Sequence, residues 1–222
     1  MNPITIADQA APEVEPAERF SLQLRKATTS DHRSAEHSSA MTDLIRGELP
    51  LDGFVRMQAQ VAFVYDALES AADRLVDDPI AGPFVDERLR RLPSLRRDLE
   101  VLGGTEVAVI EPTAATKRYC DRITSIADDW SAGLVAHHYT RYLGDLSGGQ
   151  HIRGVVERVY GIDADSGSSF FHFADLDDAD VFKGNYRKLL DGMPLTPEEQ
   201  LRFVEEVSTA YSLSTEMFIS LD

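Results

Sequence analysis

The chain is poor in cysteine, and this shortage excludes several kinds of site. Cys120 is the only cysteine among 222 residues. The chain therefore has no internal disulfide and no C-x-x-C pair for metal or redox chemistry. A single cysteine is typical of a protein that works in a reducing compartment.

Positive charge is also scarce. Lys and Arg number 22 against 38 Asp and Glu, which gives a formal net charge of −16. Such a balance argues against general binding of nucleic acid or of an anionic membrane surface. Any anionic ligand must therefore meet a local cluster of basic side chains.

Long apolar runs are missing as well. No stretch approaches the roughly 20 apolar residues that span a bilayer. The opening MNPITIADQAAPEVEPAE lacks the basic and apolar regions of a signal peptide, and no apolar anchor follows the final MFISLD. We expect a soluble cytoplasmic protein without a membrane anchor.

A phosphate-binding loop is absent too, although residues 146–150 read LSGGQ, the signature pentapeptide of ABC transporter ATPases. Nucleotide binding in that class requires the motif G-x-x-x-x-G-K-[ST]. No Gly-Lys pair occurs anywhere in the chain. The ATPase interpretation is therefore excluded.

What is present is helical spacing of apolar residues, and no strand alternation stands out. We expect an all-α, single-domain, multi-helix fold in residues 19–222, preceded by a flexible tail in residues 1–18. Thr113 and Thr196 are expected helix caps, the latter in a capping box with Glu199. The expected helices cover residues 21–46, 52–76, 86–102 with an interruption at Pro93, 113–130, 131–160 and 180–190, and a last helix begins at Pro197.

Glycines interrupt the helical segment 131–160. Gly144 and Gly148 are four residues apart and share a helix face. One interpretation is that another helix packs closely there; the other is that a flat ligand lies against bare backbone. Arg141 and Asp145 are also four apart, which by default indicates a solvated ion pair.

Taken together, residues 137–150, HHYTRYLGDLSGGQ, closely resemble the signature segment of the haem oxygenase family. The resemblance extends to LRKATTSDHRSAEHSSAM, KGNYRKLLDGMPLTPEE and the final helix, and so runs from about Leu22 to Phe218. It implies that haem is sandwiched between the first helix and the kinked glycine-rich helix. It also implies cleavage of haem by O2 and reducing equivalents to biliverdin, CO and ferrous iron.

The resemblance further implies a set of site residues. His32 would bind the iron, whereas His37 lies on a different face of the same helix. The implied catalytic residues are Asp145, Arg141 and Tyr65, with Asp145 holding a water that supplies a proton. The implied haem-binding residues are Arg25, Glu36, Tyr139, Gly144, Gly148, Lys183, Tyr186, Arg187 and Phe218. Without the family, Lys183 and Arg187 would simply indicate a solvated face.

The chain departs from the family pattern at a few positions. Thr29 stands where animal members carry a lysine, Ser214 replaces an asparagine, and Arg90 replaces a histidine of the distal network. These differences bear on the details of haem contact and water order.

Haem would serve as both substrate and oxygen-activating cofactor, and the electrons would come from an external donor. No flavin or nicotinamide motif is present, so a ferredoxin or a flavoprotein reductase is the expected partner. The chain has an arginine-rich segment that is either a docking patch for the electron donor or a solvated helix face. Its members are Arg88, Arg90, Arg91, Arg96 and Arg97. The alternatives are a non-catalytic haem carrier or storage protein of the same fold, and a helical bundle that binds no haem.

Overall fold

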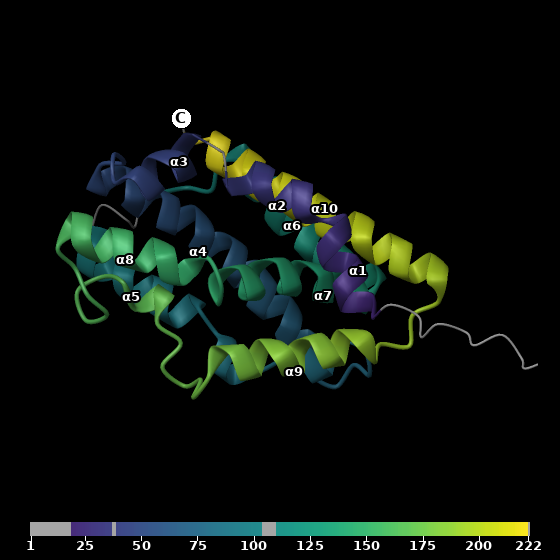
Figure 1. The fold of residues 1–222 in the computed structure, drawn as a ribbon. Helices are drawn as coiled ribbons and strands as arrows, with labels where there is room; N and C mark the ends of the chain where they lie inside the picture. Colours follow the sequence, from purple (N-terminus) through teal and green to yellow (C-terminus); the bar gives the residue numbers. More distant parts are fainter. Residues whose placement is uncertain (1–18, 37–38, 104–109, 222) are drawn as a thin grey trace, which may run out of the picture.

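The computed structural model describes residues 19–36, 39–103 and 110–221, without the side chains at positions 32, 34–36 and 39. Residues 1–18, expected to form a flexible tail, lie outside this description. The described residues form helices and turns and no strand, which confirms the all-α fold (Figure 1). None of the described helices has the length and apolar character needed to cross a membrane. The helices are α1 (Phe20–Ala27), α2 (Thr29–Glu36), α3 (Ser39–Arg46), α4 (Leu51–Arg74), α5 (Leu92–Gly103), α6 (Ala114–Asp129), α7 (Ser131–His138), α8 (Gly149–Tyr160), α9 (Ala179–Asp191) and α10 (Pro197–Ile219).

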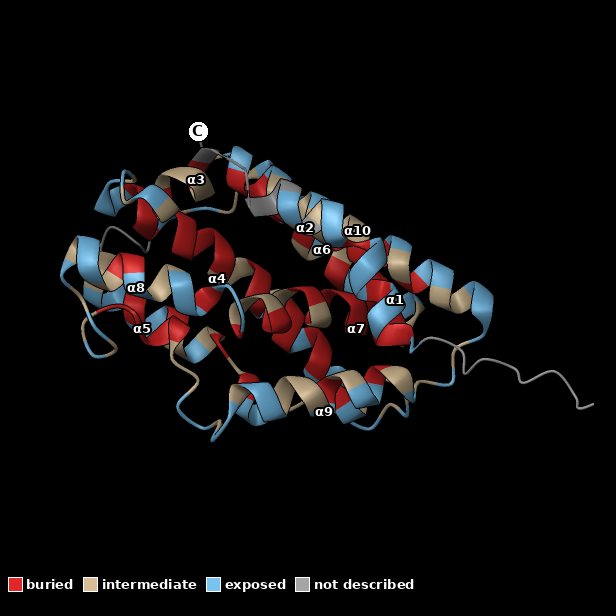
Figure 2. Cartoon of the chain, in the orientation of Figure 1, coloured by how far each residue is buried: buried red, intermediate tan, exposed pale blue. Residues whose placement is uncertain are grey.

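Helix α4 is the central element of the core. Its apolar side chains point in several directions, and Phe54, Val64 and Leu68 are fully buried. A helix of this kind must be surrounded by others, and α4 contacts α5, α6 and α7. Figure 2 shows the buried residues concentrated on α4 and α7, with exposed residues on the outer faces of α1, α9 and α10. Helices α4 and α7 thus form the interior framework from which the site is built.

Several helix ends follow directly from the sequence. The Thr196 side chain accepts a hydrogen bond from the Glu199 N–H, and the Glu199 side chain accepts one from the Thr196 N–H. This confirms the expected capping box. Thr113 caps α6 by accepting from the Thr116 N–H. Helix α8 ends at Gly161, whose φ of 67° is the left-handed conformation that glycine adopts readily.

The long first helix expected over residues 21–46 is wrong. Thr28 separates α1 from α2, and its hydroxyl donates to the Leu24 carbonyl at 2.9 Å. A threonine bonded to its own helix in this way competes with the regular ladder. The third expected helix also breaks earlier than Pro93. A short 3₁₀ turn, η2 (Glu87–Leu89), precedes α5, and Pro93 lies in the first turn of α5, where proline is tolerated.

A buried polar cluster joins α6, α7 and α10. Glu206 accepts hydrogen bonds from His137 Nε2 at 2.8 Å and from the Arg122 guanidinium. Burial by itself would raise the pKa of Glu206, but these two hydrogen bonds outweigh it and lower the pKa to about 2. Burial keeps His137 neutral by lowering its pKa. The ionised Glu206 carboxylate therefore fastens α7 to α10.

We expect this cluster to make folding sensitive to acid. Because the folded pKa of Glu206 is about 2, its contribution is present above its unfolded pKa of about 4.3 and is lost as the pH falls toward 2. The contribution is on the order of 3 kcal/mol. The measurement is the free energy of unfolding against pH for the unsubstituted protein and Glu206→Gln. Their difference should shrink below about pH 4, whereas Glu216→Gln, at an exposed position, should leave the profile unchanged. A constant difference down to pH 2 would refute the assignment.

Candidate active site

The glycine-rich helix is kinked, as the sequence predicts. Helix α7 continues into a π-helical turn, η4 (Tyr139–Leu143), and regular α8 begins only at Gly149. The Gly144 carbonyl accepts from both the Ser147 and the Gly148 N–H groups, at 3.1 and 2.8 Å. π-turns inside helices often occur at functional sites. The irregular stretch lies at the middle of the molecule, between α7 and α8 (Figure 1).

The two glycines of this stretch present bare backbone to open space. A Cβ added at Gly144 would meet nothing within 4 Å, and one at Gly148 would meet only the Gly144 carbonyl oxygen at 3.6 Å. Close packing of another helix therefore does not explain either glycine. The structure favours the second interpretation, in which the face is left open for a ligand.

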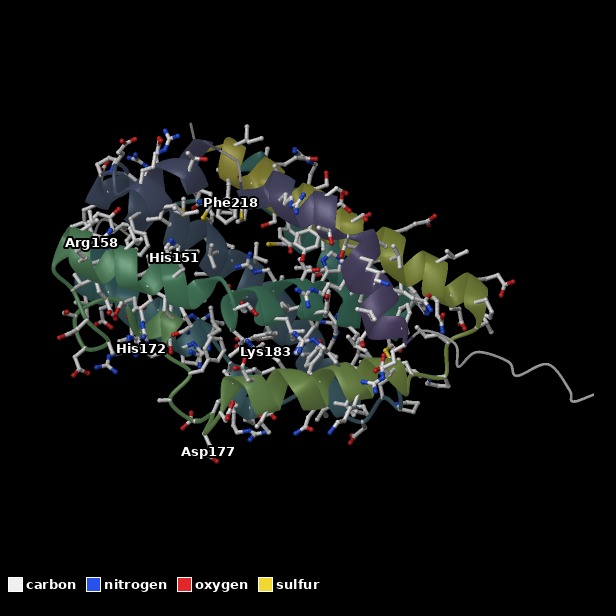
Figure 3. All side chains as sticks on the ribbon, viewed as in Figure 1. His151, Arg158, His172, Asp177, Lys183 and Phe218 are labelled. Atoms are coloured by element: carbon white, nitrogen blue, oxygen red, sulfur yellow. The ribbon has the colours of Figure 1, made fainter. Side chains whose placement is uncertain are left out.

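A cavity of about 390 Å³ lies against this glycine face. A volume of this size is in the range of small-molecule sites. Figure 3 shows Phe218 on α10 and His151 on α8, two helices that contribute to its wall. The lining is largely apolar and includes Met41, Ile45, Ile152, Phe218, Arg141 and Asp145. The cavity thus joins apolar surface to one charged pair.

Arg141 and Asp145 line this cavity, and the buried Tyr65 contacts both of them. The Tyr65 hydroxyl donates to Asp145 Oδ2, and Arg141 Nη2 lies 3.7 Å from Asp145 Oδ1. Burial raises the pKa of Asp145, and Arg141 and the Tyr65 hydrogen bond oppose that rise. The buried Arg141 Nε has no hydrogen-bond partner among the described residues. A carboxyl group of raised pKa beside an unsatisfied donor can hold a water and exchange a proton with it.

A second layer of polar groups supports this cluster, and sequence reasoning missed it. Buried Glu69 accepts from the Arg91 N–H at 2.6 Å and from the Tyr142 hydroxyl at 3.3 Å. The Tyr142 ring packs edge-on against Tyr65, with centroids 5.4 Å apart. The sequence signal that could have indicated them is their nearness to predicted site residues. Glu69 follows Tyr65 by four residues, and Tyr142 follows Arg141 directly. This layer holds the Tyr65 ring in place.

A second cavity, also about 390 Å³, adjoins the first, and Gly144 and Tyr211 line both. Its polar lining is basic, and none of the described residues that line it is acidic. The residues that line it include Arg25, Thr29, Arg33, Tyr139, Ser147 and Arg187. Burial raises the pKa of Tyr139, and nearby Arg187 and Arg25 oppose the rise. In a chain of net charge −16, a cavity with this lining suits an anionic ligand.

Two residues expected in that basic cluster lie elsewhere. Lys183 on α9 is ion-paired with Asp180 at 2.8 Å and is not among the lining residues (Figure 3). Tyr186 is buried and its hydroxyl bonds to His138 Nδ1 at 2.9 Å. Burial lowers the pKa of His138 to about 3, so its neutral ring accepts this bond. Tyr186 therefore anchors α9 to α7, and of the three only Arg187 reaches the cavity.

Two further residues expected at the site, His32 and Glu36, lie on α2, which contacts α10. Their side chains are outside the described residues. Their roles therefore stay predictions from the sequence.

The arginine-rich segment is not a free docking patch. Arg91 is buried and donates to the carbonyl oxygens of Phe170 and His172. The other members are paired with carboxylates: Arg88 with Asp86, Arg90 with Asp73 and Glu87, Arg96 with Asp66, and Arg97 with Asp165. Their charges are locally neutralised, which favours the alternative of a solvated face.

Comparison with known proteins agrees with this geometry. The family model described as heme oxygenase matches residues 18–220. The heme oxygenase of Guillardia theta is 34% identical over 204 residues, which cover 91% of this chain and 86% of that protein. The crystal structure of heme oxygenase-1 from the cyanobacterium Synechocystis sp. in complex with heme has a TM-score of 0.87 at 32% identity, covering 92% of this chain and 93% of that one. The structure of heme oxygenase from Leptospira interrogans has a TM-score of 0.87 at 30% identity, covering 91% of this chain and 100% of that one. The chain belongs to the haem oxygenase family.

Proposed function

We propose that this haem oxygenase holds haem between α2, where His32 would bind the iron, and the open face of Gly144 and Gly148. The two adjoining cavities support this arrangement. The first is largely apolar and suits a porphyrin ring, with Phe218 in its wall. The second is lined by arginines and suits the edge that carries the carboxylates. Glu36 would lie near His32 on the same helix.

When bound, haem supplies the iron that activates O2 and the ring that is opened to biliverdin, CO and ferrous iron. The protein itself is proposed to supply a proton to the reaction. The observation that carries this proposal is the cluster of Tyr65, Asp145 and Arg141 beside the cavity. Asp145 would hold a water together with Arg141 Nε and pass a proton into the cavity. The Tyr65 hydroxyl orients the carboxyl group.

The carboxylates of haem would be bound by Arg25 and Arg187, with the Tyr139 hydroxyl between them. Arginine suits this task because its guanidinium stays charged and can bind a carboxylate through two parallel hydrogen bonds. Lys183 would lie outside the cavity, paired with Asp180, and Tyr186 would hold α9 in place.

A haem carrier of the same fold is the weaker alternative, because a carrier has no need of an acid beside the bound ring. As electron donor we propose a ferredoxin or a flavoprotein reductase of the cytoplasm.

The test is conversion of haem by the purified protein with a ferredoxin, its reductase and O2, followed by pigment analysis. We expect biliverdin and CO from the unsubstituted protein. His32→Ala should lose the iron–histidine stretch in resonance Raman spectra of the ferrous form and weaken haem binding by at least ~10-fold. Added imidazole should restore the band.

His37→Ala is the matched control, since this histidine follows His32 by five residues. It should retain the iron–histidine band and the activity. If instead His37→Ala loses the band and His32→Ala keeps it, the ligand has been assigned to the wrong histidine.

A further inference from the structure

We propose that Arg33 is a specificity-determining residue that binds a haem carboxylate, as the third guanidinium of a subsite formed with Arg25 and Arg187. The inference rests on the proposed function and deepens it. No sequence motif singled out Arg33, which follows His32 directly on α2.

The three arginines come from three different helices and line one cavity. Arg25 belongs to α1, Arg33 to α2 and Arg187 to α9, and all three contribute to the same wall. None of the described residues in that wall carries a carboxylate. Such a concentration of positive charge is unexpected in a chain with 38 acidic and 22 basic residues. It therefore indicates an anionic ligand with more than one negative group.

The geometry of α2 makes Arg33 the cation that this helix brings to the subsite. Thr29 and Arg33 are four residues apart and share a helix face, and both line the cavity. The Thr29 hydroxyl is already engaged, because it donates to the Arg25 carbonyl at 2.7 Å. Among the side chains of α2 that the structure describes, Arg33 is therefore the charged one that lines this cavity.

Lys183 does not take this place. The lysine side chain does not line the cavity, whereas Arg33 does. The cationic groups that do line it are therefore guanidinium groups, which can bind a carboxylate through two parallel hydrogen bonds.

Three guanidinium groups facing two carboxylates allow more than one pairing. The pairing that forms sets the rotation of the ring within its own plane. That rotation would decide which meso carbon faces Asp145. Arg33 thus bears on both the affinity for haem and the isomer of biliverdin released.

The experiment compares the binding of haem and of haem dimethyl ester, which lacks both negative charges, by absorbance titration. Arg33→Gln should weaken haem binding about tenfold, as expected when a charge-assisted hydrogen bond is lost. It should leave ester binding unchanged and alter the ratio of biliverdin isomers. Arg33→Lys, which keeps the charge, should recover most of the affinity.

Arg158→Gln is the control, because Arg158 is exposed at the far end of α8, away from the cavity (Figure 3). It should match the unsubstituted protein in every measurement. Equal weakening of haem and ester binding by Arg33→Gln, or no effect together with an unchanged isomer ratio, would overturn the carboxylate role. Failure of the unsubstituted protein to bind haem would overturn the proposed function itself, and the inference with it.

Discussion

Gly144→Leu is expected to give a protein that is more stable and no longer binds haem. Gly144 has helical backbone angles, φ −61° and ψ −52°, and a Cβ there would meet nothing within 4 Å. Leucine should therefore stabilise the helix by up to about 1 kcal/mol relative to glycine. Because Gly144 lines both cavities, the same side chain would fill the space where haem is proposed to lie. We expect a loss of haem affinity of at least ~100-fold.

Two measurements separate these effects, thermal unfolding without haem and absorbance titration with haem. Gly154→Leu is the matched control, since Gly154 lies on α8, a Cβ there also meets nothing within 4 Å, and the residue lines neither cavity. It should gain stability and keep its affinity for haem. Tight haem binding by Gly144→Leu would mean that haem lies elsewhere.

Asp145→Ala is expected to bind haem but to form little biliverdin. The carboxyl group lies at the cavity wall and its partners there are Tyr65 and Arg141. Its removal takes away the proposed proton donor, and general acids typically contribute 10²–10⁴-fold to a rate. We therefore expect a fall of at least ~100-fold in the rate of biliverdin formation, with haem affinity nearly unchanged.

Two further variants separate acidity from water positioning. Asp145→Asn keeps an acceptor for the Tyr65 hydroxyl, so partial activity there would show that placing the water matters more than donating the proton. Tyr65→Phe removes a hydrogen bond that lowers the pKa of Asp145. In this variant the pKa of Asp145 should rise further. If the protonated carboxyl group is needed, biliverdin formation should persist to higher pH. Biliverdin formation by Asp145→Ala at the unsubstituted rate would rule out the acid role.

The sequence predicted best those features that depend on neighbours along the chain. The caps at Thr113 and Thr196 follow from hydrogen bonds over three residues. The kink before α8 is implied by the resemblance of residues 137–150 to the family segment. The spacing of glycines in the sequence is the same whether they allow another helix to pack closely or face a cavity. Spacing alone therefore does not distinguish the two. Only the arrangement of the other helices decided between them at Gly144.

Features that depend on contacts distant in sequence were harder to predict. Helix α9 carries three residues with different surroundings. Lys183 pairs with Asp180, Tyr186 is buried in the core, and Arg187 lines the cavity. The arginine-rich segment shows the same limit, because its partners Asp66, Asp73 and Asp165 come from other parts of the chain. Helical spacing gives the face of a residue but not what lies opposite it.

The π-helical turn at Tyr139–Leu143 lets one continuous helical segment pack in the core before the turn and border the cavity after it. A π-turn accommodates one residue more than an α-turn, which shifts everything after it by about 100° around the axis. Before the turn, residues 132–138 are buried and hold the helix in the interior. After it, Gly144 and Asp145 border open space. The extra residue thus rotates the helix face after the turn relative to the face before it. The residues before the turn can therefore pack in the core while Gly144 and Asp145 face the proposed haem site.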